Sequence, residues 1–483
     1  MCLVFRVDNN VPQYPRICEN VFMIPDKRMP SLVDTQETGT RSVTTSTVQR
    51  SRHHRRRWFV VLGVIVIALL SVSLTAYLHP GVLAYLVPDI AQIADDDLRV
   101  PTVSEVPEEQ NAYNDLVRLE AMVNIPEEEQ EAFVRMVQGG AWDDVVANDI
   151  LSRNTEVLAL YAVAAGKHVF QAPYASAPRR MTWATNMPSL GSWRTAAQLS
   201  SLAARSLARQ GQASEAFDTA LQSVRIGQNI MLSYTNFHSF LVSIALRRVG
   251  LDAVRDIAAS SSLRSSELSE FAEELSQYSI NENALIQTLK VEYTVAANSI
   301  AAAALGDESV LNEVSGFVSM DAVPMLVDAY HFQPNKTTLL LAQHWRSLLT
   351  EAHGLCDRRI SASAGEMATG TRAGMAYLIR PNAFGEYLAY ESMFPIQEDR
   401  MCIDMAQVAA TQAVLALYAY RQDNGQYPNV LADLVPQYLA GVPFDPYDGK
   451  EIKYTPIERM VYSSGRDMVS GAQIADVLSF YLR

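Results

Sequence analysis

The chain has 483 residues, of which 49% are hydrophobic and 19% are charged, and its formal net charge is −14. Soluble globular proteins carry about 25% charged residues, so this sequence is unusually poor in charge. The length suffices for several domains with buried cores, which excludes a wholly disordered chain and a disulfide-stapled mini-protein. The four cysteines show no Cys-x-x-Cys spacing, which excludes a recognisable zinc ribbon or iron–sulfur motif.

The charge is divided unevenly along the chain. Residues 1–57 contain ten Lys/Arg and five Asp/Glu, a net charge of +5, whereas residues 79–483 contain 29 and 48, a net charge of −19. The first segment is rich in Ser, Thr and Arg without a periodic apolar pattern, which predicts a disordered, basic cytoplasmic tail. The acidic remainder argues against nucleic acid as a partner.

An uncharged segment, residues 58–78, separates these two parts. As a helix it would span about 30 Å, the thickness of a bilayer core, and Trp58 and Tyr77 stand near its ends. Arginines precede it and the first charges after it are Asp89 and Asp95–Asp97, so the positive-inside rule predicts a cytoplasmic N-terminus. We expect a single-pass protein of the bacterial inner membrane with a periplasmic C-terminal part. The alternative is a cleaved signal peptide, whose apolar core would be shorter, about 7–15 residues.

Four prolines interrupt residues 79–107, which predicts a stalk. Residues 108–398 are rich in Ala and Leu, and their apolar residues recur at intervals of three and four, so we expect an extracytoplasmic α-helical domain. It would be a bundle or an irregular helical array. Long helices are expected around 236–259, 265–304, 338–360 and, beyond this domain, 399–422.

Two of the predicted helices form a hairpin around Gly211. The first carries Leu199 and Leu202 and ends at the glycine, and the second begins at Ser214, a good N-cap residue. The small residues along both helices make the pair TPR-like, that is, similar to one tetratricopeptide unit. The pattern does not recur in register 34 residues later, so a regular solenoid is not expected.

Residues 399–483 are predicted to form a small α+β module. Residues 404–420 are apolar on nearly every side, so this helix should be buried by surrounding elements. A short helical turn at 430–435 and three short strands follow, at 451–454, 459–462 and 476–482. The expected outcome is a helix packed on a short antiparallel sheet.

This module resembles the C-terminal domain of type II secretion major pseudopilins. The resemblance lies in the order of its motifs, DNGQYP at 423–428, DP at 445–446 and YSSGRD at 462–467. The whole chain also looks like membrane-anchored helical proteins of unknown function from planctomycete-type bacteria. The resemblance implies a link to a secretion or pilus-like system.

The same resemblance implies one metal ligand. In pseudopilins the loop at this position binds calcium, and the matching carboxylate in this chain is Asp467. The alternative is that Asp467 caps a turn between two strands, because the glycine that follows in pseudopilins is replaced by Met468 and Ca²⁺ requires six or more oxygen ligands. No other cofactor is expected.

Two cysteines, Cys356 and Cys402, would lie in an oxidising compartment under the predicted topology. They are therefore candidates for a disulfide, and the alternative is two free thiols buried as small hydrophobic side chains.

No catalytic motif is present, neither a dinucleotide-binding nor a P-loop glycine pattern, nor a zinc-protease or serine-hydrolase signature. The favoured hypothesis is a non-catalytic envelope scaffold or interaction protein, whose partners are the lipid bilayer and envelope proteins. The alternative is a periplasmic hydrolase whose carboxylates come from distant helices.

Overall fold

A computed structural model describes part of the chain in two compact units, Met1–Ser73 and Leu74–Arg483. The described residues are 58–71, 74, 80–185, 190–260, 263–280, 282–318, 328–353, 356, 380–392, 399–465 and 478–482. In the first unit they form a helix, Trp58–Ser71, whose large apolar side chains are exposed all around. The predicted tail at 1–57 and most of the rest of the predicted anchor lie outside the described residues.

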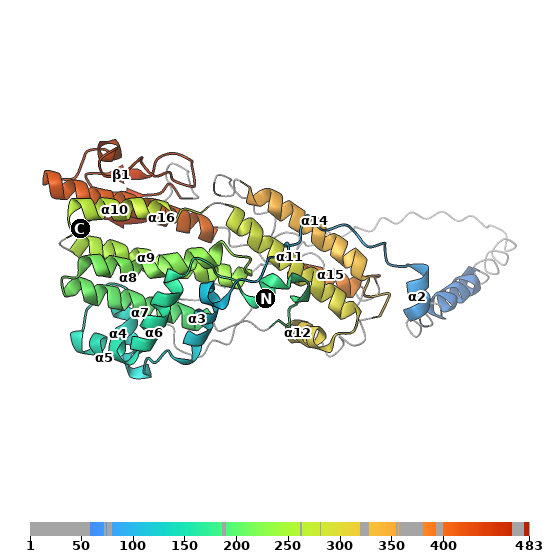
Figure 1. Ribbon diagram of the computed structural model, residues 1–483. Helices are drawn as coiled ribbons and strands as arrows, with labels where there is room; N and C mark the ends of the chain where they lie inside the picture. Colours follow the sequence, from blue (N-terminus) through green and yellow to red (C-terminus); the bar gives the residue numbers. More distant parts are fainter. Residues whose placement is uncertain are drawn as a thin grey trace, which may run out of the picture. The chain divides into compact units, whose positions relative to one another are not determined.

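The second unit is mainly helical, as predicted, and carries a short antiparallel sheet (Figure 1). Its longer helices are α4 (Glu127–Val137), α5 (Asp144–Arg153), α6 (Thr155–Gly166), α7 (Leu190–Arg209), α8 (Ala213–Met231), α9 (Phe237–Ser260), α10 (Ser265–Ser276), α11 (Asn283–Ala304), α12 (Glu308–Val318), α14 (Pro334–Ala352), α15 (Ala383–Ser392) and α16 (Asp399–Asn424). Its short helices are α2 (Pro80–Leu86), η1 (Glu108–Gln110), α3 (Ala112–Arg118), η2 (Leu119–Ala121), η3 (Pro173–Ser176), η4 (Pro178–Arg180) and η8 (Leu431–Leu434).

The predicted hairpin around Gly211 is confirmed as α7 and α8. Gly211 has a φ of +80°, a left-handed conformation that glycine adopts without steric cost, and this lets the chain reverse. The prediction that Ser214 caps the second helix is wrong, because α8 already begins at Ala213. The N-cap position is occupied by Gln212, whose side chain makes no capping hydrogen bond.

Helices α8 and α9 pack closely through glycines. A Cβ atom on Gly227 would lie 2.6 Å from the Ser243 carbonyl oxygen, and one on Gly250 would lie 2.7 Å from the Ala220 carbonyl oxygen. Both distances are below van der Waals contact, so only glycine permits this approach. The pairing of 227 with 243 and of 250 with 220 makes the two helices antiparallel.

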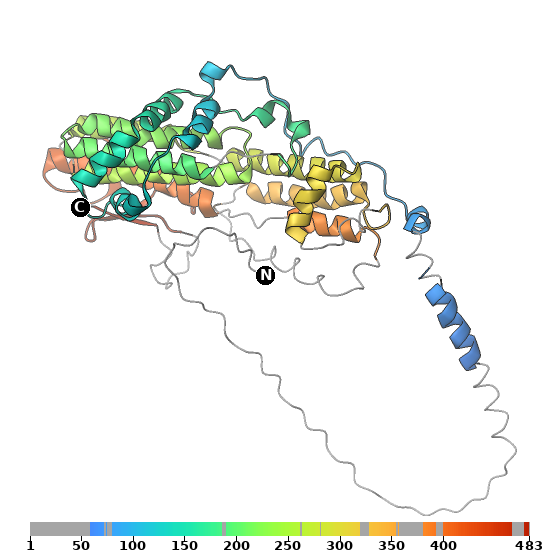
Figure 2. The same ribbon diagram turned by 90° about the horizontal axis from the view of Figure 1, so that it is seen from below.

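The prediction of a buried apolar helix at 404–420 is confirmed by α16. This helix packs against α9 and α10, and the three lie side by side in Figures 1 and 2. Among the described helices, Arg400–Asn424 is the one long and apolar enough to cross a membrane, and 89% of its most apolar window is buried. In this unit it is therefore a core helix.

The predicted antiparallel sheet is confirmed, although its strands are shorter than expected. It consists of β1 (Lys453–Thr455), β2 (Met460–Tyr462) and β3 (Ser479–Tyr481) in the order β1-β2-β3. Val461 is completely buried and belongs to the same hydrophobic cluster as residues of α16. The sheet thus covers one side of the buried helix.

A single hydrophobic cluster joins the predicted helical domain to the predicted C-terminal module. It contains Phe217 of α8 and Leu275 of α10 together with Leu417 of α16 and Val461 of β2. The sequence boundary at residue 399 therefore does not separate two cores.

The segment predicted as a stalk, 79–107, packs along the helices instead of standing free. Leu98 is buried with 1% of its surface exposed, and it lies in the cluster formed by α11 and α14. The Arg99 guanidinium donates to Asn298 Oδ1 at 3.0 Å. Asp89 accepts hydrogen bonds from the backbone N–H groups of Asn335 and Lys336 at 2.8 and 3.0 Å. The prolines prevent long helices here, but they do not prevent packing.

Candidate functional site

A groove of about 1000 Å³ runs along α9 within the second unit. Its floor follows α9 from Leu241 to Ala259, a length of about 27 Å at 1.5 Å per residue. Residues of α7 line one side, and residues of α16 and β3 line the other. No known catalytic motif lies among the described lining residues, and the side chains themselves determine what the groove can bind.

The three helices around the groove run in the same direction. Asp404 and Thr411 of α16 contact Arg247 and Arg255 of α9, so residue numbers increase together along both helices. Helix α7 is antiparallel to α8 as a hairpin partner, and α8 is antiparallel to α9, so α7 is parallel to α9 as well. The position of a residue along the groove, here called its level, can therefore be compared between the three helices.

Three exposed arginines lie at one level of the groove: Arg194 of α7, Arg248 of α9 and Arg400 of α16. Arg194 precedes Arg205, the partner of Asp256, by 11 residues, which places it level with residue 245 of α9 (256 − 11). Arg400 precedes Asp404, the partner of Arg247, by four residues, which places it level with residue 243 (247 − 4). The three α-carbons therefore lie within about 8 Å along the groove axis.

These three arginines are poorly neutralised. Among the described residues, Arg194 and Arg400 form no ion pair, and the nearest carboxylate oxygen to Arg248 is on Asp252 at 3.9 Å. The lining as a whole contains five arginines and three aspartates, in a unit that is otherwise strongly acidic. This end of the groove thus carries a local positive charge.

The other arginines of the groove are tied to aspartates. Arg205 Nη2 lies 2.6 Å from Asp256 Oδ2, and Arg255 forms an ion pair with Asp252 one turn away. Arg255 also donates to Thr411 Oγ1 at 2.5 Å, and its guanidinium lies 4.3 Å from the centre of the Phe480 ring. Burial lowers the pKa of Arg255, while Asp252 and Asp256 act to raise it.

One buried donor in the lining has no acceptor. Arg205 is 7% exposed, and its Nε–H makes no hydrogen bond among the described residues. A buried donor without an acceptor costs about 1–3 kcal/mol.

An ion pair lies directly beneath the groove. Arg247 Nε donates to both carboxylate oxygens of Asp404, at 3.1 and 2.9 Å, and both side chains are completely buried. Burial raises the pKa of the Asp404 carboxyl, although the charge of Arg247 and its hydrogen bonds act in the opposite direction. The Arg247 guanidinium also donates hydrogen bonds to Gln228 Oε1 and to the Tyr278 carbonyl oxygen. The ion pair with Asp404 links α9 to α16.

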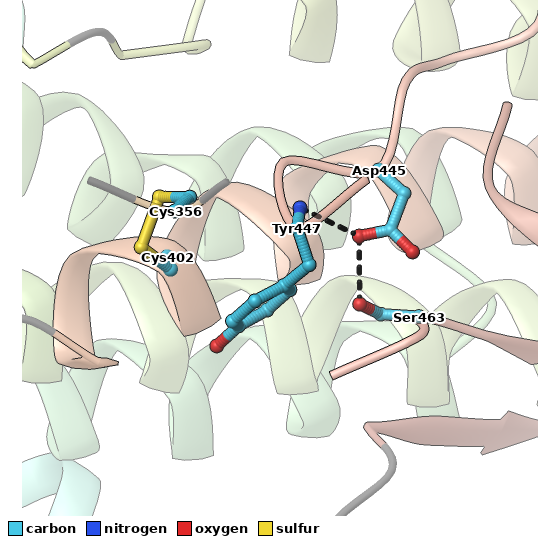
Figure 3. Close-up of a disulfide and its surroundings, with 5 residues drawn as sticks. All are labelled: Cys356, Cys402, Asp445, Tyr447 and Ser463. Carbon is cyan, nitrogen blue, oxygen red and sulfur yellow. Dashed lines mark hydrogen bonds between the residues drawn. A yellow bond between two sulfur atoms is a disulfide. The ribbon is translucent and has the colours of Figure 1, made fainter. Parts of the chain in front are cut away.

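The two cysteines singled out in the sequence are bonded to each other (Figure 3). Their α-carbons lie 5.6 Å apart, and the bond links Cys356 to Cys402 near the beginning of α16. Cys402 lies two residues from both Arg400 and Asp404. The disulfide therefore holds the part of α16 that brings Arg400 to the groove.

The predicted calcium ligand, Asp467, lies outside the described residues. Among the described residues of the same module, Asp445 is completely buried and accepts hydrogen bonds from Ser463 Oγ and the Tyr447 N–H at 2.8 and 3.1 Å (Figure 3). Lys453 Nζ lies 2.7 Å from Asp445 and 2.6 Å from Asp448, so an ammonium group already bridges these two carboxylates. The part of the chain that the structure describes holds no group of three metal-ligating side chains.

The arginine groove was not predicted from the sequence. A signal was present on α9, where Arg248, Asp252, Arg255 and Ala259 follow one another at intervals of four, three and four and share one helix face. The two other arginines of the cluster come from helices distant in sequence, and no local pattern places them beside α9.

The comparisons with known proteins give no relative. No family model, no curated protein and no solved structure matches this chain.

Proposed function

We propose that this chain is a non-catalytic interaction protein, anchored in the bacterial inner membrane, which holds an envelope protein partner in the groove along α9. The observation that carries the proposal is the groove itself, which is about 27 Å long and has a cluster of poorly neutralised arginines at one level. A cleft of this length accommodates a stretch of polypeptide better than a small metabolite.

The proposed anchor is residues 58–78. Its described part, Trp58–Ser71, is a helix whose apolar side chains are exposed on every side, for example Phe59 at 70% and Ile67 at 64%. Such a surface is stable in a lipid bilayer and unfavourable in water. The basic residues before it and the acidic residues after it support a cytoplasmic N-terminus and a periplasmic second unit.

The arrangement of charges supports binding over hydrolysis. A hydrolase would need a carboxylate or histidine free to exchange a proton with a substrate. The described residues that line the groove include no histidine, and each of the three aspartates among them lies next to an arginine: Asp252 beside Arg255, Asp256 beside Arg205, and Asp404 beside Arg247. The alternative proposal, a periplasmic hydrolase, is therefore the weaker one.

The link to a type II secretion or pilus-like system remains part of the proposal. It rests on the motif order of residues 423–467, and a helix packed on a short antiparallel sheet is compatible with it.

Site-specific photo-crosslinking in cells that produce the protein tests the proposal. A photoreactive phenylalanine analogue at Ala245, on the groove floor, should give a discrete adduct with one envelope protein, and the adduct should fractionate with membranes. The matched control position is Val145 on α5, which is 79% exposed and outside the groove. Absence of an adduct at 245, or the same adducts at both positions, would contradict the proposed function.

A further inference from the structure

The geometry points to an acidic polypeptide segment as the occupant of the groove, bound through Arg194, Arg248 and Arg400. This inference rests on the proposed function and specifies the chemistry of its partner.

The charge of the groove is complementary to that of an acidic ligand. Three arginines from three separate helices have their α-carbons at about the same level of the groove, and Arg194 and Arg400 have no carboxylate partner among the described residues. Guanidinium groups bind carboxylates through paired N–H donors, and such hydrogen bonds are about twice as strong as neutral ones. The surrounding unit has a net charge of −19, so the charge of this basic cluster is opposite in sign to that of the unit as a whole.

The length of the groove distinguishes a polypeptide from a small ligand. The lining follows α9 from Leu241 to Ala259, about 27 Å at 1.5 Å per residue. An occupant that fills the groove must therefore be extended, which excludes a single small anion.

The uncharged part of the groove lining suits a polypeptide. Gln198 and Gln407 can form hydrogen bonds with main-chain amides of a ligand. The apolar side chains between these polar groups are those of Ile244, Val249 and Val414. A polypeptide offers main-chain amides, apolar side chains and carboxylates in one linear molecule. An anionic polysaccharide lacks the apolar side chains, so the lining favours a peptide.

The test is binding of a fluorescently labelled deca-glutamate peptide to the full chain in detergent micelles, followed by fluorescence anisotropy at low salt. The triple variant Arg194→Glu, Arg248→Glu, Arg400→Glu should weaken binding at least tenfold. The matched control is Arg118→Glu, Arg135→Glu, Arg264→Glu, which makes the same charge change on exposed arginines outside the groove and should change binding less than twofold.

Three outcomes would overturn the inference. These are no binding of deca-glutamate, an equal loss in the control variant, or complete displacement of the peptide by equimolar inorganic phosphate or by polygalacturonate. If deca-glutamate fails to bind but the wild-type chain still gives the crosslink at Ala245, the acidic partner is refuted and the proposed interaction protein is not. If the wild-type chain gives no crosslink at Ala245, both proposals are refuted.

Discussion

Arg247 of α9 and Asp404 of α16 form an ion pair in which neither side chain is exposed to solvent, and 157 residues separate them in the sequence. The pair fixes the parallel alignment of the two helices, and that alignment brings Arg400 to the level of Arg248. The shape of the groove thus depends on a contact that lies below it.

We predict that breaking this pair destabilises the fold strongly. Arg247→Met leaves the Asp404 carboxylate buried without its partner, which should cost about 3–5 kcal/mol in the free energy of unfolding. Urea denaturation of the full chain, followed by circular dichroism, measures this. The double variant Arg247→Met, Asp404→Leu removes both charges and should recover a large part of the loss. A single variant as stable as the wild type would show that the pair does not hold the helices together.

The close approach of α8 and α9 is predicted to require Gly250. In Gly250→Ala the new Cβ would meet the Ala220 carbonyl oxygen and the Val224 side chain, and such overpacking costs about 1–3 kcal/mol. The higher helix propensity of alanine, worth up to about 1 kcal/mol, offsets this only in part. The midpoint of thermal unfolding should fall. The control Gly441→Ala, where a Cβ meets nothing within 4 Å, should leave it unchanged.

The disulfide is predicted to stabilise both the fold and the groove. It closes a loop of 46 residues, and the loss of chain entropy in the unfolded state corresponds to about 4 kcal/mol. Cys402→Ser should lower the free energy of unfolding by about this amount, whereas Cys18→Ser, in the predicted cytoplasmic tail, should not. If both variants unfold at the same urea concentration as the wild type, the bond contributes nothing measurable.

The C-terminal module is predicted to lose stability in acid through Asp448. Burial acts to raise the pKa of this carboxyl, but hydrogen bonds from Lys453, the Lys450 N–H and Ser464 lower it overall. A lowered pKa means that the stabilisation is present above the unfolded value of about 3.9 and is lost as the pH falls through the folded value. Urea denaturation of the full chain at pH values between 5 and 2 measures this loss of stability.

The control for the acid transition is Asp448→Asn, which cannot titrate at this position. This variant should be less stable at neutral pH and should show a smaller further loss in acid. An acid transition identical to that of the wild type would exclude Asp448 as its origin.

Local patterns in the sequence sufficed for several parts of the fold. The apolar run at 404–420 predicts a buried helix because nearly every side of it is apolar, and alternation predicts the strand near Phe480. Gly211 predicts the turn between α7 and α8 because it tolerates a positive φ. Each of these conclusions depends only on neighbouring residues.

The groove could not be predicted in the same way. Apolar periodicity shows which face of α9 is buried, but not that α16 lies against it from about 150 residues away. The charged face of α9 has the same appearance as an ordinary solvated helix surface. The packing of the segment predicted as a stalk was missed for a related reason, because Leu98 and Asp89 contact residues about 200 or more positions later.

We propose that the partner occupies the groove and is held there by the arginines of the groove. The most direct measurement is the crosslink from the photoreactive residue at Ala245, compared between the wild-type chain and the variant Arg194→Glu, Arg248→Glu, Arg400→Glu at equal expression. We predict that the adduct disappears in this variant and persists in the matched variant Arg118→Glu, Arg135→Glu, Arg264→Glu. An adduct of undiminished intensity in the groove variant would contradict the account.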